Sequence, residues 1–200
     1  MIRSYTWADL LTLANASCGT VTVFLCLSYI ARDQTEFLWW GFVLPLFAFV
    51  FDAADGYVAR LDTRRQSRLG ADLDSLADVI SFGVAPAVLG FTLGLRGGWD
   101  MLILAYFVVC GVSRLARFNV TAASLADETT GKVKYFEGTP IPTSIALVAL
   151  LAVAFLTNHM NERMWFGEYR VWFAGFHPLA LLYGLSGSAM ISGTLRIPKP

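Results

Sequence analysis

The chain has 200 residues, of which 56% are hydrophobic and only 15% are charged, and its mean hydropathy is +0.57. About a quarter of the residues in a soluble domain are charged, so this composition excludes an ordinary soluble domain and predicts an integral membrane protein. The formal net charge is zero, and bulk charge therefore gives no reason to expect nucleic-acid binding. We expect residues 1–200 to form a single membrane domain.

Six segments are apolar enough to form membrane-spanning helices, which need about 20 residues each. Residues 1–9 are polar and aromatic, and they predict a short helix lying on the membrane interface. The predicted spans cover residues 10–31, 38–60, 72–95, 100–118, 140–160 and 170–191. The expected fold is therefore all-α, a six-transmembrane-helix bundle with a short amino-terminal interfacial helix.

Positive charge predicts the orientation of this bundle, because cytoplasmic loops are enriched in lysine and arginine. If the amino terminus is cytoplasmic, the inner side holds eleven of the fifteen basic residues, and the outer side holds only Arg32, Arg96, Arg163 and Arg170. Both termini are then cytoplasmic, as are the polar ends of spans two, three and four.

Four aspartates stand at the cytoplasmic ends of spans two and three, together with small residues at helical spacing. On a helix, residues three, four, seven and eight positions apart share one face, so each run forms a stripe. The first stripe consists of Asp52, Asp55, Gly56, Ala59 and Arg60, and the second consists of Gly70, Asp74 and Asp78.

The simplest interpretation of these acids is that the helices end in solvated carboxylates. Grouped carboxylates at a membrane edge repel one another without cations, however, and glycine and alanine on the same stripes leave room for a ligand. Hard oxygen ligands at this density suit Mg²⁺ or Mn²⁺, which bind carboxylates together with phosphate oxygens. The sequence therefore predicts a divalent-metal site with space for a phosphate-bearing ligand.

The two stripes, read together, match a longer pattern: Asp-x2-Asp-Gly-x2-Ala-Arg, nine residues, then Gly-x3-Asp-x3-Asp. This pattern resembles the signature of the CDP-alcohol phosphatidyltransferase family, and every specified position is filled. The resemblance implies a six-helix fold, usually a homodimer, that replaces the CMP of a CDP-linked lipid with an alcohol. It also implies Mn²⁺ or Mg²⁺ as cofactor, with two ions in each active site.

The resemblance assigns roles to the matched positions. Asp52, Asp55 and Asp74 would hold metal and the diphosphate, and Asp78 would be a metal ligand, the catalytic base, or both. The small residues would leave space for the nucleotide of CDP-diacylglycerol, and the arginine would help to fix the site: Gly56, Ala59, Gly70 and Arg60.

Asn15 lies near the cytoplasmic end of span one, together with Thr12. It could contact the nucleotide, or it could form a hydrogen bond between helices.

A second group of polar residues lies on the same side, at the end of span four and beyond. Arg114 and Arg117 share a helix face, and they could anchor the helix to lipid headgroups or receive a carboxylate through paired hydrogen bonds. Glu137 beside Gly138 could receive an ammonium group. A substrate with a carboxylate, an amine and a hydroxyl would use all of these. The candidate residues for binding serine are Arg114, Arg117, Phe118, Asn119, Tyr135, Glu137 and Gly138.

Residues 74–86, 114–119, 136–142 and 186–198 resemble the serine-using members of the family, with the last two stretches nearest to the fungal type. This resemblance implies that the phosphatidyl group of CDP-diacylglycerol is transferred to L-serine, giving phosphatidylserine and CMP. It implies the endoplasmic reticulum membrane for a eukaryotic source and the plasma membrane for a prokaryotic one.

Three alternatives remain open on the sequence alone. A sibling transferase would use inositol, inositol phosphate or glycerol phosphate in place of serine. A divalent-cation transporter would use the acids as a transit site, but such sites usually lie near the membrane midplane. A prenyltransferase also has aspartate-rich motifs, but these lack the Gly-Ala-Arg spacing found here.

Overall fold

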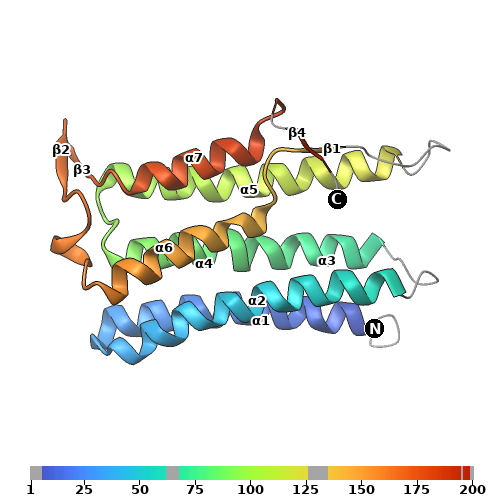
Figure 1. The fold of residues 1–200 in the computed structure, drawn as a ribbon, viewed down its shortest axis with the longest axis horizontal. Helices are drawn as coiled ribbons and strands as arrows, with labels where there is room; N and C mark the ends of the chain where they lie inside the picture. Colours follow the sequence, from blue (N-terminus) through green and yellow to red (C-terminus); the bar gives the residue numbers. More distant parts are fainter. Residues whose placement is uncertain (1–5, 62–67, 126–134, 195, 199–200) are drawn as a thin grey trace.

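The computed structural model describes residues 6–61, 68–125, 135–194 and 196–198. Within these ranges the helices form six long rods that run back and forth along one axis (Figure 1). Rod three consists of α3 and α4 joined by a π-helical segment, η3. A 3₁₀ turn, η4, leads into α6 in rod five. The rods are α1 (Trp7–Arg32), α2 (Thr35–Leu61), α3–η3–α4 (Arg68–Asp78, Val79–Val84, Ala85–Leu93), α5 (Gly98–Leu125), η4–α6 (Ile141–Ser144, Ile145–Leu156) and α7 (Ala180–Ile191).

Two small antiparallel sheets lie at opposite ends of the bundle (Figure 1). Strand β1 (Tyr135–Glu137) pairs with β4 (Arg196–Pro198), and β2 (Tyr169–Val171) pairs with β3 (Ala174–Phe176). A short 3₁₀ helix, η5 (Asn161–Arg163), precedes the second sheet.

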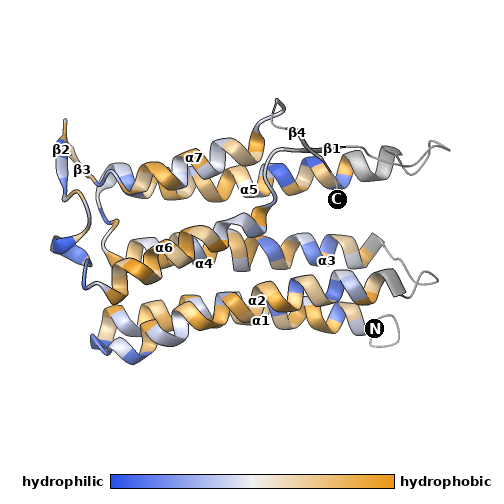
Figure 2. Ribbon diagram, in the orientation of Figure 1, coloured by the Kyte–Doolittle hydropathy of each residue, from blue (hydrophilic) through white to orange (hydrophobic). Residues whose placement is uncertain are grey.

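Four of the described helical stretches are long and apolar enough to cross a membrane: Trp7–Arg32, Thr35–Ala59, Leu69–Leu93 and Gly98–Val120. The remaining two rods contain the shorter apolar helices Ile141–Leu156 and Ala180–Ile191. Apolar residues cover most of every rod, whereas polar residues gather at the two ends of the bundle (Figure 2). The predicted all-α membrane bundle is thus confirmed.

The sixth span is shorter than predicted, because a β-hairpin replaces its first part. Residues 170–176 belong to β2, β3 and the turn between them, in which Trp172 has a left-handed φ of 57°. Arg170, Gly175 and Pro178 interrupt the apolar helical pattern there, so helix α7 begins only at Ala180.

The predicted interfacial helix is also different in the part that is described. Thr6 caps α1 by accepting a hydrogen bond from the main-chain N–H of Asp9, while the Asp9 carboxylate accepts one from the N–H of Thr6 at 2.6 Å. This reciprocal cap starts the first spanning helix at Trp7, so residues 7–9 are the first turn of α1. Residues 1–5 lie outside the described ranges.

Rod three is the central element of the bundle. In its most apolar window 67% of the residues are buried inside the protein, compared with 28% in each of the first two rods. Phe82, Leu89 and Leu93 on this rod are fully buried, and the hydroxyl of Tyr183 on α7 donates to the carbonyl of Pro86 at 2.8 Å. The other rods therefore pack around the helix that carries Asp74 and Asp78.

Helix α1 contacts the π-helical segment of rod three without intervening side chains. The hydroxyl of Ser81 in η3 donates to the main-chain carbonyl of Asn15 at 2.8 Å. One turn further along α1, a Cβ added at Gly19 would lie 2.5 Å from Oγ and 2.7 Å from Cα of Ser81. Only glycine permits this approach, which fixes α1 against the segment that follows Asp78.

A buried Asp–His pair closes the end of the bundle that carries β2 and β3. Oδ2 of Asp100, near the start of α5, lies 2.6 Å from Nδ1 of His177, and Oδ1 of Asp100 accepts the main-chain N–H of His177 at 2.8 Å. Oδ2 also accepts the N–H of Gly97. These bonds tie the chain before α7 to the start of α5, which is a structural role.

We expect Gly19→Ala to destabilise the protein, because the added methyl group would overlap main-chain and side-chain atoms of Ser81. Overpacking of this kind lowers the free energy of unfolding by about 1–3 kcal/mol. Thermal unfolding in detergent measures the effect. Gly41→Ala on α2 is the matched control, because its Cβ would meet only Leu89 at an ordinary 3.6 Å. Equal melting temperatures for the two variants would contradict the proposed close packing.

Candidate functional site

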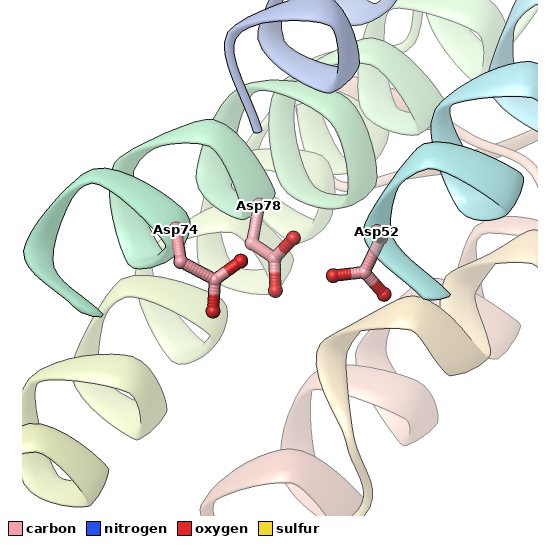
Figure 3. Close-up of side chains that lie close together, drawn as sticks. All are labelled: Asp52, Asp74 and Asp78. Carbon is pink, nitrogen blue, oxygen red and sulfur yellow. The ribbon is translucent and has the colours of Figure 1, made fainter. Parts of the chain in front are cut away.

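Three of the four predicted aspartates converge at one end of the bundle. Asp52 comes from α2, and Asp74 and Asp78 stand one turn apart on α3, so all three carboxylates face one space (Figure 3). One oxygen from each carboxylate lies within 4.8 Å of the other two. Asp78 is buried, and Asp52 and Asp74 are half-buried.

This donor set fits a divalent cation. All three groups offer oxygen, the ligand that Mg²⁺ and Mn²⁺ prefer. Oδ1 of Asp74 is buried and has no hydrogen-bond partner among the described residues, and the same is true of Oδ1 of Asn15. Buried acceptors of this kind are costly unless a donor or a cation reaches them. The cluster therefore has the chemistry of a metal site with unused ligand atoms.

Helix α1 supplies hydrogen-bond donors to two of the acids. Thr12 donates from Oγ1 to Oδ2 of Asp55 at 2.7 Å, and Asn15 donates from Nδ2 to Oδ1 of Asp78 at 3.3 Å. Thr12 and Asn15 are three residues apart and so share a face of α1. Of the two possibilities for Asn15, the structure shows the hydrogen bond between helices.

Asp55 is the fourth predicted acid, and it is not part of the three-carboxylate cluster. It is buried, with its carboxylate directed to Thr12. Next to it, Gly56 is half-buried, and a Cβ added there would have no atom within 4 Å. The small residue thus leaves open space beside Asp55.

The remaining residues of the two stripes lie on the same two helices. Ala59 is half-buried on α2, and Gly70 is half-buried in the first turn of α3. Arg60 belongs to α2 by its backbone, and its side chain lies outside the described part.

The predicted acceptor residues on α5 differ in their surroundings. Arg114 is buried, and its Nε has no hydrogen-bond partner among the described residues. Arg117 donates from Nη2 to the carbonyl of Ile191 at 3.2 Å. Asn119 donates from Nδ2 to Oγ of Ser75 on α3 at 3.0 Å, and Phe118 is exposed.

The hydrogen bond between Asn119 and Ser75 fixes the position of α5 along its axis relative to α3. The two helices run in opposite directions, and both continue into the bundle from this contact (Figure 1). Arg114 lies deeper along α5 and Asp78 lies deeper along α3, so the guanidinium of Arg114 is at the acid-bearing end of the bundle and interacts with the charge of Asp78.

The second predicted acceptor stretch follows β1. Tyr135 and Glu137 lie in this strand by their backbone, and their side chains are outside the described part. Gly138 is buried and has a φ of +75°, a conformation that favours glycine.

The π-helical segment, the role of Ser81 and the contact between Thr12 and Asp55 were not predicted from the sequence. The π-helical segment has no local sequence signature, and Ser81 is an isolated hydroxyl in an apolar run. The contact from Thr12 to Asp55 had a weak signal, since Thr12 and Asn15 are polar residues three apart on an otherwise apolar helix.

The bundle and its carboxylate cluster define a class, an all-α membrane protein with a site suited to a divalent cation at one end. The family model for CDP-alcohol phosphatidyltransferase matches residues 5–180. The chain therefore belongs to the CDP-alcohol phosphatidyltransferase family, which confirms the family resemblance of its two aspartate stripes.

Three curated relatives show how far the similarity extends. The CDP-diacylglycerol–serine O-phosphatidyltransferase of Saccharomyces cerevisiae is 42% identical over 100% of this chain and 73% of its own length. The archaetidylserine synthase of Methanothermobacter thermautotrophicus is 37% identical over 77% of this chain and 59% of its own length. The CDP-diacylglycerol–serine O-phosphatidyltransferase of Helicobacter pylori is 36% identical, with shares of 79% and 62%. No significant match to a solved structure was found.

We expect Asp74→Asn to weaken Mn²⁺ binding by at least about tenfold, because even groups that only support metal ligands are worth roughly 10- to 100-fold in affinity. Electron paramagnetic resonance of free Mn²⁺ in titrations of the purified protein measures this affinity. Asp72→Asn is the matched control, because Asp72 is exposed on the same helix. Unchanged Mn²⁺ affinity in Asp74→Asn would show that the cluster is not a metal site.

Proposed function

We propose that this chain is a CDP-diacylglycerol–serine O-phosphatidyltransferase, or phosphatidylserine synthase, that depends on Mn²⁺ or Mg²⁺. The observation that carries the proposal is the convergence of Asp52, Asp74 and Asp78 at the end of the bundle that also holds Arg114, a buried residue whose Nε has no hydrogen-bond partner among the described residues. The names of the yeast and bacterial relatives support serine as the acceptor.

The aspartates would hold the metal and the diphosphate of CDP-diacylglycerol. Asp52, Asp74 and Asp78 are grouped for this role, and Asp55 stands one turn from Asp52 on α2 with open space beside Gly56. When bound, the cation would neutralise charge on the diphosphate and make CMP a better leaving group. Gly56, Ala59 and Gly70 would leave room for the nucleotide, with Arg60 and Asn15 at its border.

Asp78 would act as the base on the acceptor. It takes the proton of the serine hydroxyl, the hydroxyl oxygen forms a bond to the phosphorus of the phosphatidyl group, and the bond from that phosphorus to CMP breaks. CMP leaves with the electron pair. The hydrogen bond from Asn15 would hold the Asp78 carboxylate in place for this step.

The acceptor side would recognise the two charged groups of serine. Arg114 is buried with an unused Nε–H, so a serine carboxylate would satisfy it through a charge-assisted hydrogen bond. Glu137 would receive the ammonium group. The serine-binding site would be lined or supported by the remaining candidates, Arg117, Phe118, Asn119, Tyr135 and Gly138.

Purified protein with Mn²⁺, CDP-diacylglycerol and radiolabelled serine tests the reaction. We expect labelled phosphatidylserine and an equal amount of CMP. Arg114→Gln should raise the KM for serine about tenfold, which corresponds to about 1.4 kcal/mol, with little change in the KM for CDP-diacylglycerol. Arg163→Gln is the control, since Arg163 lies in η5 at the opposite end of the bundle. Incorporation of inositol or glycerol phosphate instead of serine would overturn the acceptor assignment.

We propose that the acid-bearing end faces the cytoplasm, and that the enzyme is a homodimer. Eleven of the fifteen basic residues belong to that side by the predicted topology, and helix α1 begins at the acid-bearing end (Figure 1). CDP-diacylglycerol and soluble serine would meet there, at the endoplasmic reticulum membrane in a eukaryote or the plasma membrane in a prokaryote. The family resemblance supports the homodimer.

Thiol labelling tests the orientation. In sealed cytoplasmic-side-out vesicles, Asp72→Cys should react at once with a membrane-impermeant maleimide, because residue 72 is exposed at the acid-bearing end. Arg170→Cys, exposed at the other end, should react only after the vesicles are opened. The reverse pattern would place the site on the outer side.

A further inference from the structure

The carboxyl end of α7 and strand β4 contact the residues assigned to serine. We propose that residues 189–194 and 196–198 form a positioning element that holds Arg117 and the stretch 135–139 for serine, and that this element sets the affinity for the acceptor. The inference rests on the proposed function and adds a second part of the chain to its acceptor site.

The first contact joins α7 to helix α5. Arg117 donates from Nη2 to the carbonyl of Ile191 at 3.2 Å, and Ile191 is the last residue of α7. Carbonyls at the end of a helix have no partner within the helix and carry partial negative charge. The end of α7 is therefore a natural acceptor for this guanidinium, and it fixes the direction in which Arg117 extends.

The second contact joins α7 to the stretch after β1. The main-chain N–H of Thr139 donates to the carbonyl of Ala189 at 3.2 Å. A Cβ added at Gly138 would lie 2.2 Å from the carbonyl oxygen of Met190. The chain at residue 138 thus runs directly against α7, in a left-handed conformation that suits glycine. Oγ1 of Thr139 is buried and has no partner among the described residues, so this stretch retains a polar atom for a ligand.

The third contact is the small sheet beyond α7. Strand β4 pairs antiparallel with β1, with Tyr135 opposite Pro198, Phe136 opposite Ile197 and Glu137 opposite Arg196. Strand β4, which follows α7 in the chain, therefore lies beside the acceptor stretch.

These contacts separate the support of the acceptor residues from the support of the acids. The donors to Asp55 and Asp78 come from α1, whereas the contacts of Arg117 and residues 138–139 come from the end of α7. Loosening the end of α7 should therefore weaken serine binding and leave the binding of the CDP-lipid nearly unchanged. A general loss of packing would weaken both.

Gly138→Ala is the first test, because its added methyl group would point at α7. We expect the KM for serine to rise about tenfold, while the KM for CDP-diacylglycerol and the affinity for Mn²⁺ change less than about twofold. Gly167→Ala is the matched control: Gly167 also has a positive φ, of 66°, but a Cβ there would meet nothing within 4 Å. Its serine KM should stay at the wild-type value.

A second variant reports on β4 alone. Replacement of Arg196-Ile197-Pro198 by Gly-Ser-Gly should also raise the serine KM selectively, whereas the same replacement of Tyr169–Val171 in β2 should not. If the wild-type protein makes no phosphatidylserine, the proposed function fails. If it does, the positioning role is overturned by an unchanged serine KM in both test variants, by equal rises in both KM values, or by failure of both variants to fold.

Discussion

Grouping carboxylates inside an apolar bundle is the constraint on which this structure depends. Asp52, Asp74 and Asp78 bring oxygens within 4.8 Å of one another, and their mutual repulsion would be opposed by the cation proposed to bind them and is opposed by a hydrogen-bond donor from α1. Asn15 on α1 donates to Asp78, and Ser81 binds the main chain of the same asparagine. The packing of α1 against rod three is therefore part of the site.

Support for the two proposed substrates comes from opposite flanks of rod three. On one flank α1 reaches Asp55 and Asp78, and on the other α5 reaches Ser75 through Asn119. The central rod is the most buried of the four long apolar helical stretches among the described residues, so it separates the two groups of contacts. In the proposed reaction, the residues that hold CDP-diacylglycerol and those that hold serine would therefore be supported by different helices, on either side of the phosphorus that is transferred.

Much of the site could be predicted because its residues follow helical spacing. The stripes that begin at Asp52 and Gly70 depend only on the rise and turn of an α-helix, which puts Asp74 and Asp78 on one face of α3. Asp52 joins them through the packing of the bundle. The bond from Thr12 to Asp55, the π-helical segment and the bond from Arg117 to Ile191 depend on packing between rods, which a local pattern does not contain. The hairpin before α7 was missed because its residues are apolar enough to resemble a span, although Gly175 and Pro178 gave a signal.

The π-helical segment η3 has a consequence for how the chain can change. An α-helix turns about 100° per residue, and a π-helical turn accommodates additional residues without breaking the rod. The six residues of η3 therefore wind through a smaller angle than six α-helical residues would, which keeps Asp74 and Asp78 on one side in phase with Pro86 on the other. If the same number of residues adopted α-helical geometry, the acids would rotate relative to the core below them. The number of residues in this segment, as well as their identity, is thus a requirement of the site.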